Sequence, residues 1–208
     1  MRLIGLRKTF IDSIHPIENI EINRNNSKAN FSADSVFEPA LAYMVSEKNL
    51  LKEIQIKIDS ADIEVFTEPN KINLDNSSDK VSIELDRESI QASLLIACDG
   101  ASSKIKDQLN IIKKIKDFKQ NAIVFSFETS TDTENKAKQY FLEDSILALL
   151  PVSSSTISVV WSCNQDFFEK LNNLNESEFI NKLKDIIGGE YKEICNICNK
   201  NNFPLTMI

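Results

Sequence analysis

The sequence contains very little glycine. Its 208 residues include only four, which are Gly5, Gly100, Gly188 and Gly189. A dinucleotide-binding loop (G-x-G-x-x-G) and a P-loop (G-x-x-x-x-G-K-S/T) both need closely spaced glycines, because the backbone must approach a pyrophosphate. Neither pattern can be assembled from these four positions. The usual first phosphate-binding loop is therefore excluded for this sequence.

A basic surface and long apolar runs are also missing. The formal net charge is -7, and lysine and arginine do not cluster. Because a polyanion requires a basic face, nucleic acid is not an expected partner. No apolar run approaches the roughly 20 residues that a membrane-spanning helix needs, and charged residues near the start interrupt any signal-peptide core. These features predict a soluble, cytoplasmic protein.

Histidine and cysteine offer no clear catalytic or metal centre. His15 is the only histidine, and no nucleophile pattern accompanies it, so Ser-His-Asp chemistry is not indicated. Cys195 and Cys198 have the spacing of a zinc or redox pair, but a structural zinc site needs two further ligands. The other two cysteines are scattered singly. We therefore assign no metal site and leave the catalytic residues unassigned.

The hydrophobic pattern predicts a mixed α+β (α/β) fold. Alternating segments at 17–23, 61–68 and 80–86 predict strands, and 46–58 predicts a helix with a serine cap. After Lys116, four strand-like segments indicate an antiparallel sheet. Two amphipathic helices should follow within 164–187, the second capped by Ser177 and ended by Gly188.

The stretch SLLIACDGASSKIKDQL, residues 93–109, is the strongest sign of a ligand site. The apolar run 90–97 predicts a strand buried on both faces. Asp-Gly is a strong hairpin signal, but Ile105, Leu109 and Ile112 recur at helical spacing instead. A helix N-terminus that follows a buried strand presents free backbone N–H groups to ligands. We therefore expect either a cofactor site at Asp99–Gly100 or a plain turn.

Three segments together resemble the FAD-dependent aromatic hydroxylases of the para-hydroxybenzoate hydroxylase type. Residues 99–106 (DGASSKIK) resemble their central D-G-x-x-S-x-x-R motif, with Lys106 in place of arginine. Residues 41–51 resemble G-Y-V/I-V/I-E-N-R-x-L, with Lys48 at the arginine position. Residues 140–161 resemble R-F-x-x-x-G-P-L-A-L-L-P-L and the strand after it, which ends in V-W. The ordered set is most similar to the ubiquinone-biosynthesis hydroxylases and extends from about Pro16 to Leu205.

The resemblance implies a flavin monooxygenase that uses FAD and NAD(P)H to hydroxylate a prenylated phenolic ring. It implies five cofactor-binding residues, which are Asp99, Gly100, Ser103, Lys106 and Lys48. It also implies that one strand lines the substrate cavity, through Leu147, Leu149 and Pro151. Arginine differs from lysine in its planar fork, so bidentate contacts are not expected at Lys106 or Lys48. A prenylated substrate suggests a peripheral membrane contact.

Two parts of the family pattern are missing, since the G-x-G-x-x-G unit would precede Met1 and a G-D motif would follow Ile208. We therefore expect a central fragment. Residues 1–112 would form a partial FAD-binding, Rossmann-like portion interleaved with substrate-domain strands, and 113–208 the substrate-domain sheet with its helices. Such a chain would bind FAD weakly and need complementary segments of a split hydroxylase. The alternative is a non-catalytic remnant, or a binding module that retains the substrate sheet.

Overall fold

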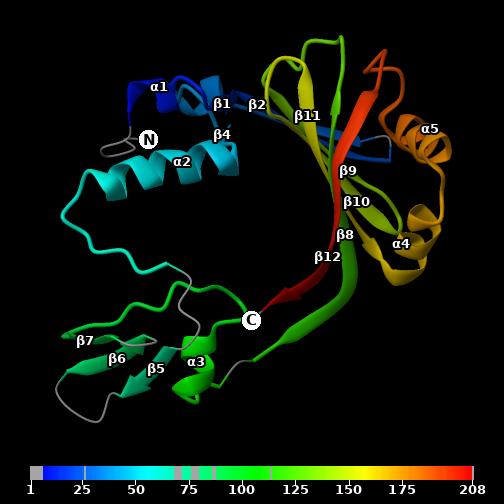
Figure 1. The fold of residues 1–208 in the computed structure, drawn as a ribbon. Helices are drawn as coiled ribbons and strands as arrows, with labels where there is room; N and C mark the ends of the chain where they lie inside the picture. Colours follow the sequence, from blue (N-terminus) through cyan, green and yellow to red (C-terminus); the bar gives the residue numbers. More distant parts are fainter. Residues whose placement is uncertain are drawn as a thin grey trace. The chain divides into compact units, whose positions relative to one another are not determined.

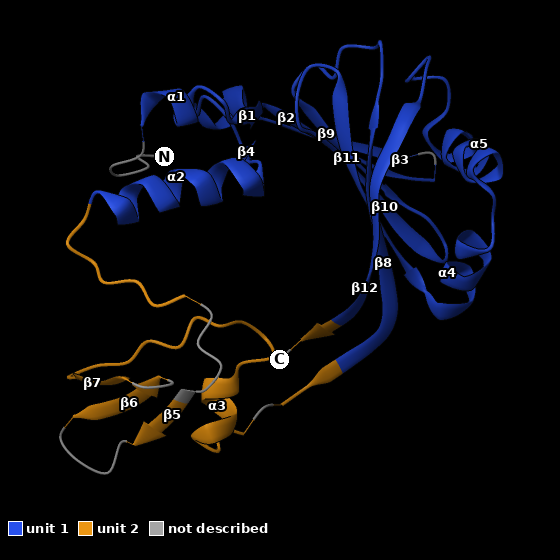
Figure 2. Ribbon diagram, viewed as in Figure 1, with its two compact units in different colours: residues 1–60, 117–205 blue, residues 61–116, 206–208 orange. Residues whose placement is uncertain are grey.

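The chain folds into two compact units (Figure 2). The computed structural model describes residues 7–25, 27–67, 72–75, 80–85, 88–112 and 114–207. The larger unit comprises 1–60 and 117–205, and the smaller comprises 61–116 and 206–208. The expected boundary lay at residue 112, whereas here the first 60 residues belong with the sheet of the C-terminal half. The mixed α+β class is confirmed.

A seven-stranded sheet organises the larger unit (Figure 1). In spatial order its strands are β12 (Cys195–Met207), β8 (Lys116–Glu128), β11 (Thr156–Asn164), β10 (Ser145–Pro151), β9 (Lys136–Phe141), β2 (Asn19–Arg24) and β3 (Ser27–Ser32). Strands β8, β11, β10 and β9 pair antiparallel, which confirms the sheet expected after Lys116. Strand β2 joins β9 in parallel and carries β3 at the edge.

Helices α4 (Gln165–Asn172) and α5 (Glu176–Ile187) pack on one face of this sheet (Figure 1). Side chains alternate between the two faces of a strand, so every second residue of β10 and β11 is buried beneath them. The resulting core contains Ile123, Phe125, Phe127, Leu147, Leu149, Ile157, Val159, Trp161, Leu171, Phe179 and Leu183. At its centre the indole Nε1 of Trp161 donates a hydrogen bond to Ser145 Oγ (3.1 Å).

The start of α5 differs from its expected position. Asn175, rather than Ser177, is the N-cap, and its side chain accepts a hydrogen bond from the backbone N–H of Glu178. The Glu178 carboxylate accepts one from the Asn175 N–H in return, which completes a capping box. The helix ends at Gly188, as predicted, with a φ of 66° that favours glycine.

The N-terminal part of the larger unit is built around α1 (Lys8–Ile11) and α2 (Glu47–Asp59). Strand β1 (His15–Ile17) pairs with β4 (Ala42–Met44), and a 3-10 turn, η1 (Ala33–Val36), lies between β3 and β4. Helix α2 is capped by Ser46, as predicted. The Glu53 side chain, 2% exposed, accepts hydrogen bonds from the backbone N–H and the guanidinium of Arg7. This ion pair joins the start of α1 to α2.

The smaller unit contains an antiparallel sheet of β5 (Ile72–Asp75), β6 (Val81–Leu85) and β7 (Glu88–Ala92), followed by α3 (Lys104–Gln108). The predicted buried strand at 90–97 is wrong, because β7 ends at Ala92, and Leu94 and Ile96 are each 73% exposed. Residues 61–67 of the strand expected at 61–68 also lie outside helices and strands, and Glu68 lies outside the described residues. A strand forms only against a neighbour, and these two segments pair with no strand that the structure describes.

Adjacent leucines on β10 test the two faces of the large sheet. Leu149 is 0% exposed beneath the helices, whereas Leu150 points to the opposite face and is half-buried. We expect Leu149→Ala to lower the free energy of unfolding by about 2–5 kcal/mol, because it leaves a cavity, and Leu150→Ala to lower it less. Urea unfolding followed by the fluorescence of the single tryptophan measures both. Equal losses would contradict this assignment of faces.

Candidate functional site

The Asp99–Gly100 turn precedes α3 and ends the exposed apolar run. Gly100 has a φ of 84°, which other residues rarely adopt. No atom lies within 4 Å of the position that a Cβ would take. Glycine is therefore required here for its backbone conformation, and the space beside it is open.

Side chains close the N-terminus of α3. The Ser103 Oγ accepts a hydrogen bond from the backbone N–H of Lys106 (3.0 Å), and the Asp99 carboxylate accepts one from that of Ile105 (3.5 Å). The Ser103 hydroxyl also bonds the Asp99 carboxylate, and this contact holds the pKa of Asp99 below its usual value. Asp99 is thus an ionised hydrogen-bond acceptor with an exposed side chain.

This arrangement favours a hydroxyl over a phosphate as a ligand. Two N–H groups that could bind an anion already have side-chain acceptors, and a phosphate would meet the negative charge of Asp99. A ligand hydroxyl could instead donate to the carboxylate.

Four of the five predicted cofactor residues lie together in the smaller unit. Asp99, Gly100, Ser103 and Lys106 occupy one turn and the first residues of α3. The fifth, Lys48, is exposed in the first turn of α2 and belongs to the larger unit.

The residues expected to line a substrate cavity lie in the core. Leu147 and Leu149 are 0% exposed and, with Pro151, face the side of the sheet that α4 and α5 cover. Their neighbours on β10 point the other way and are half-buried, and they are Ile146, Ala148 and Leu150. Because side chains alternate along a strand, the two faces of β10 have different surroundings.

The opposite face continues across the neighbouring strands with small and polar side chains. Ala148 lies opposite Val160, which in turn lies opposite Val124. Leu150 lies opposite Ser158 in the same way. These residues are half-buried rather than packed beneath the helices. This part of the face therefore carries small aliphatic side chains together with Ser158.

A pocket of about 520 Å³ lies beside α1 and β4 in the larger unit. Its apolar walls include Ile11, Ile14, Leu41 and Val45, and Tyr43 adds a hydroxyl. Its size is within the range of small-molecule sites. Sequence reasoning missed this pocket, although the segment that lines it, 38–45, overlaps the second family motif.

His15 differs from the surface or loop residue that the sequence favoured. It lies in β1 opposite Met44, and its Nε2 atom is buried with no hydrogen-bond partner among the described residues. Buried polar atoms usually have a hydrogen-bond partner, so this nitrogen is a candidate contact for a ligand.

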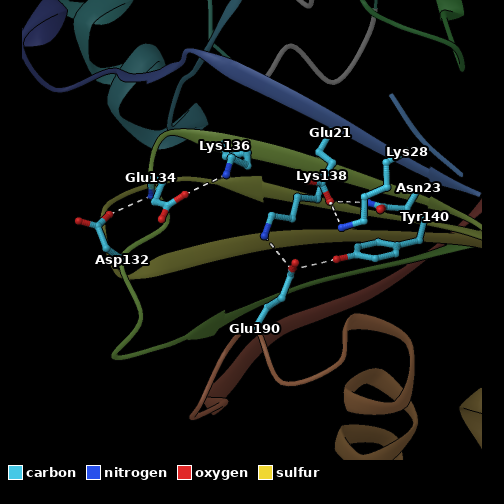
Figure 3. Close-up of polar contacts among 9 residues, drawn as sticks. All are labelled: Glu21, Asn23, Lys28, Asp132, Glu134, Lys136, Lys138, Tyr140 and Glu190. Atoms are coloured by element: carbon cyan, nitrogen blue, oxygen red, sulfur yellow. Dashed lines mark hydrogen bonds and ion pairs between the residues drawn. The ribbon is translucent and has the colours of Figure 1, made fainter. Parts of the chain in front are cut away.

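A charged cluster lies on the helix-covered side of the sheet (Figure 3). The Glu190 carboxylate, after α5, accepts hydrogen bonds from Lys138 Nζ (2.7 Å) and the Tyr140 hydroxyl (3.0 Å). Burial and the Glu190 charge raise the pKa of Tyr140 above its usual value. Lys28 Nζ donates to Glu21 in the same view (3.3 Å). Since these charged groups are paired with one another, the cluster stabilises the packing of the larger unit and is not an open ligand site.

A comparison with known families decides the assignment. The family described as "FAD binding domain" matches residues 1–201. The chain belongs to this family. The resemblance to FAD-dependent aromatic hydroxylases is thereby confirmed, and relatives named as ubiquinone hydroxylases support it.

Curated relatives of this FAD-binding chain include both uncharacterised and named proteins. Protein slr1300 of Synechocystis, which is uncharacterised, is 24% identical over 212 residues, covering 99% of this chain and 51% of its own length. The mouse mitochondrial ubiquinone biosynthesis monooxygenase COQ6 is 32% identical over 57% of this chain and 25% of its own length. The ubiquinone hydroxylase UbiM of Neisseria meningitidis is 22% identical over 81% of this chain and 37% of its own length. The chain thus spans at most about half of these relatives.

Solved structures share the fold. The probable FAD-dependent monooxygenase PqsL of Pseudomonas aeruginosa has a TM-score of 0.70 at 15% identity, covering 92% of this chain and 56% of its own. Klebsiella pneumoniae HpxO, complexed with FAD and uric acid, has a TM-score of 0.60 at 14% identity. The match covers 95% of this chain and 54% of the HpxO chain. No helix in the described part of the chain is long and apolar enough to cross a membrane.

The residues of the Asp99 turn fit part of FAD. Asp99 is an ionised acceptor beside the open space at Gly100, which suits a hydroxyl-bearing portion of FAD. The four glycines cannot supply a pyrophosphate loop. The fit is therefore to the sugar-like part of FAD and not to its phosphates.

The pH dependence of stability tests the capping role of Asp99. Because its folded pKa is lowered, the ionised carboxylate stabilises the folded state above its unfolded pKa, about 3.9. This contribution disappears as the pH falls from there through the folded pKa. The stability difference between the native chain and Asp99→Asn, measured by urea unfolding from pH 6 to pH 2.5, should therefore shrink below about pH 4. In a Ser103→Ala background, Asp99→Asn should change the stability less, because the carboxylate has lost its hydrogen bond from Ser103. A stability difference between the native chain and Asp99→Asn that does not depend on pH would contradict the Ser103–Asp99 contact.

Proposed function

We propose that this chain is the middle part of an FAD-dependent monooxygenase that hydroxylates the phenolic ring of a prenylated ubiquinone precursor. The observation that carries the proposal is the family match across residues 1–201, which includes the Asp99–Gly100 turn. The named ubiquinone hydroxylases among the relatives support the substrate class.

On the cofactor side, Asp99 orients FAD by accepting a hydrogen bond from one of its hydroxyls, and Ser103 holds the carboxylate in place. Lys106, half-buried in α3 next to this turn, supplies positive charge near the cofactor without a bidentate fork. Bound FAD supplies the redox chemistry, with NAD(P)H as reductant and oxygen as co-substrate.

On the substrate side, the uncovered face of β10 forms the wall against which the ring lies. Ile146, Ala148 and Leu150 present an apolar surface there, and Val160 extends it onto β11. Such a wall excludes water from the ring and fixes its orientation. Leu147, Leu149 and Pro151 support this wall from behind as core residues.

The pocket beside β4 holds the apolar tail of the substrate. Its walls are mainly aliphatic, and Asp12 and Glu38 also line it. Their negative charges disfavour a carboxylated ligand and tolerate a neutral isoprenoid chain. A substrate with such a tail resides in a bilayer, so the proposal includes a peripheral contact with the membrane surface.

The second candidate is a non-catalytic remnant or binding module. It is favoured by one observation, since the core of the larger unit between the sheet and α4–α5 is complete without any cofactor. A chain of this kind could persist for partner binding alone. A measurement of FAD binding and of phenol hydroxylation distinguishes the monooxygenase from the non-catalytic module.

A chimeric enzyme tests the proposed function. In it, this chain replaces the 173 matched residues of the Neisseria UbiM. We expect the folded chimera to bind FAD and to hydroxylate a prenylated phenol with consumption of NAD(P)H and oxygen. Asp99→Ala should weaken FAD binding about tenfold, because it removes a charged hydrogen bond, whereas Asp62→Ala should not. A folded chimera that lacks FAD, or that consumes NAD(P)H without hydroxylating a phenol, would refute the proposal.

The same chimera tests the tail pocket. Ala42→Phe fills part of the pocket, so it should raise the KM for a long-tailed prenylated phenol about tenfold and leave the KM for unprenylated phenol unchanged. Phe37→Ala is the control, since Phe37 is 97% exposed nearby and is not among the pocket residues. An equal rise for both substrates would show that the pocket does not hold the tail.

A further inference from the structure

The two edge strands of the seven-stranded sheet differ in how well they could pair with a further strand. Strand β12 forms one edge, and it contains Asn196 and Asn199 at positive φ (51° and 56°) and a proline, Pro204. Left-handed residues interrupt a regular ladder, and proline has no N–H to donate, so both features protect an edge from pairing. Strand β3 forms the other edge, and its six residues include neither feature. It is therefore the edge that can accept another strand.

The backbone groups of β3 that point away from the sheet belong to alternate residues. Ala33, directly after the strand, donates its N–H to the carbonyl of Glu18, directly before β2 (2.8 Å). In an antiparallel ladder, every second residue directs both of its backbone groups to the same neighbour. The odd-numbered residues of β3 therefore pair with β2, and Lys28, Asn30 and Ser32 direct their N–H and C=O groups outward. No strand in the described part of the chain lies on that side.

The side chains of β3 are exposed and carry little charge. Phe31 is 52% exposed, and Ala29 lies on the same face of the strand. Lys28 is the only charged residue of β3, and its ammonium group donates a hydrogen bond to the Glu21 carboxylate on β2 (3.3 Å). A lysine can keep other strands away from an edge, but this ion pair balances its charge. The edge thus presents outward backbone groups beside a large apolar ring.

We propose that β3 is the docking edge for a second copy of this chain, whose own β3 pairs with it antiparallel across a two-fold axis at Asn30. A two-fold axis perpendicular to the sheet must pass through a residue, because opposite side chains lie on the same face. With the axis at Asn30, three pairs of outward-directed residues form about six backbone hydrogen bonds. Within Ser27–Ser32, an axis at Ala29 gives only two such pairs. The register centred on Asn30 is therefore favoured.

The side chains suit this register. Phe31 lies opposite Ala29 of the second copy, so a large and a small apolar residue pack together on one face. On the other face the two Asn30 amides meet at the axis, where each can donate to the other. Lys28 lies opposite Ser32 of the second copy, two residues from its exposed Asp34. No like charges lie opposite each other within the paired strands.

The association should be weak and should stop at the dimer. An edge of six residues buries little area, and small interfaces are typical of weak complexes. The net charge of -7 adds a repulsion between copies that salt screens. The two-fold contact uses both β3 edges, and the features of β12 protect the other edge, so the sheet does not grow further.

The dimer does not depend on the proposed function. None of the proposed cofactor residues, wall residues or tail-pocket residues lies in β3. Its tests therefore need neither flavin nor substrate.

Sedimentation equilibrium measures the dimer over about 1–100 μM, the range of weak association. Asn30→Asp and Asn30→Lys each place like charges on the axis, so each should raise the dimer dissociation constant at least about tenfold. An equimolar mixture of the two variants should restore association, because aspartate then faces lysine. The same two changes at Asn201, which is exposed on the opposite edge strand, are the matched control and should leave the constant unchanged.

Amide hydrogen exchange of the native chain, resolved by NMR, tests the direction of the backbone groups. We expect the amides of Lys28, Asn30 and Ser32 to exchange more slowly as the chain concentration rises, because they become hydrogen-bonded only in the dimer. The amides of Ala29 and Phe31 already pair with β2 and should not respond to concentration.

Four outcomes would overturn the proposal. They are a native chain that stays monomeric throughout this range, a dimer whose concentration-dependent protection lies outside β3, Asn30 variants that are folded and dimerise as strongly as the native chain, and a mixture of folded variants that does not associate. The fluorescence of the buried Trp161 shows whether each variant is folded. If a variant does not fold, the exchange pattern of the native chain decides.

Discussion

The packing of α4 and α5 on one face of the seven-stranded sheet is the contact on which the larger unit depends. Phe125 packs edge to face on Phe179 there, and the Trp161 ring lies tilted against Phe179. The Trp161 indole N–H donates a hydrogen bond to Ser145. Because side chains alternate along a strand, burying one face leaves the other for a different use. The division between core and candidate substrate wall follows directly from this contact.

The candidate cofactor and substrate residues lie in three separate parts of the chain, each held by different contacts. The Asp99 turn is closed on itself by Ser103, so it presents a fixed acceptor rather than an open anion site. The β10 wall is fixed by the core behind it, and the pocket beside β4 depends on α1, which the Arg7–Glu53 ion pair ties to α2. A ligand that contacts a preorganised acceptor loses little free energy to ordering it.

Local signals in the sequence were read correctly where the interaction itself is local. The cap at Ser46 was predicted because a hydroxyl three residues before a backbone N–H needs no tertiary partner. The cap of α5 was misplaced by two residues, since Asn175 and Ser177 are both good caps and only the capping box with Glu178 separates them. The four residues that the motif around Asp99 predicts to bind the cofactor lie together in one turn and the first residues of α3.

The sequence by itself determined the family, the mixed fold class and the antiparallel strands after Lys116. It also determined the turn at Asp99–Gly100. Periodicity, caps and motifs depend on residues that are neighbours in the sequence. Only the tertiary structure decided which face of β10 is core, that β2 and β3 join the large sheet, and that Leu94 and Ile96 are exposed. An apolar run indicates that its side chains favour burial, but it does not indicate which helix or strand will cover them. That choice depends on partners distant in sequence, and for residues 93–98 the described chain does not provide them.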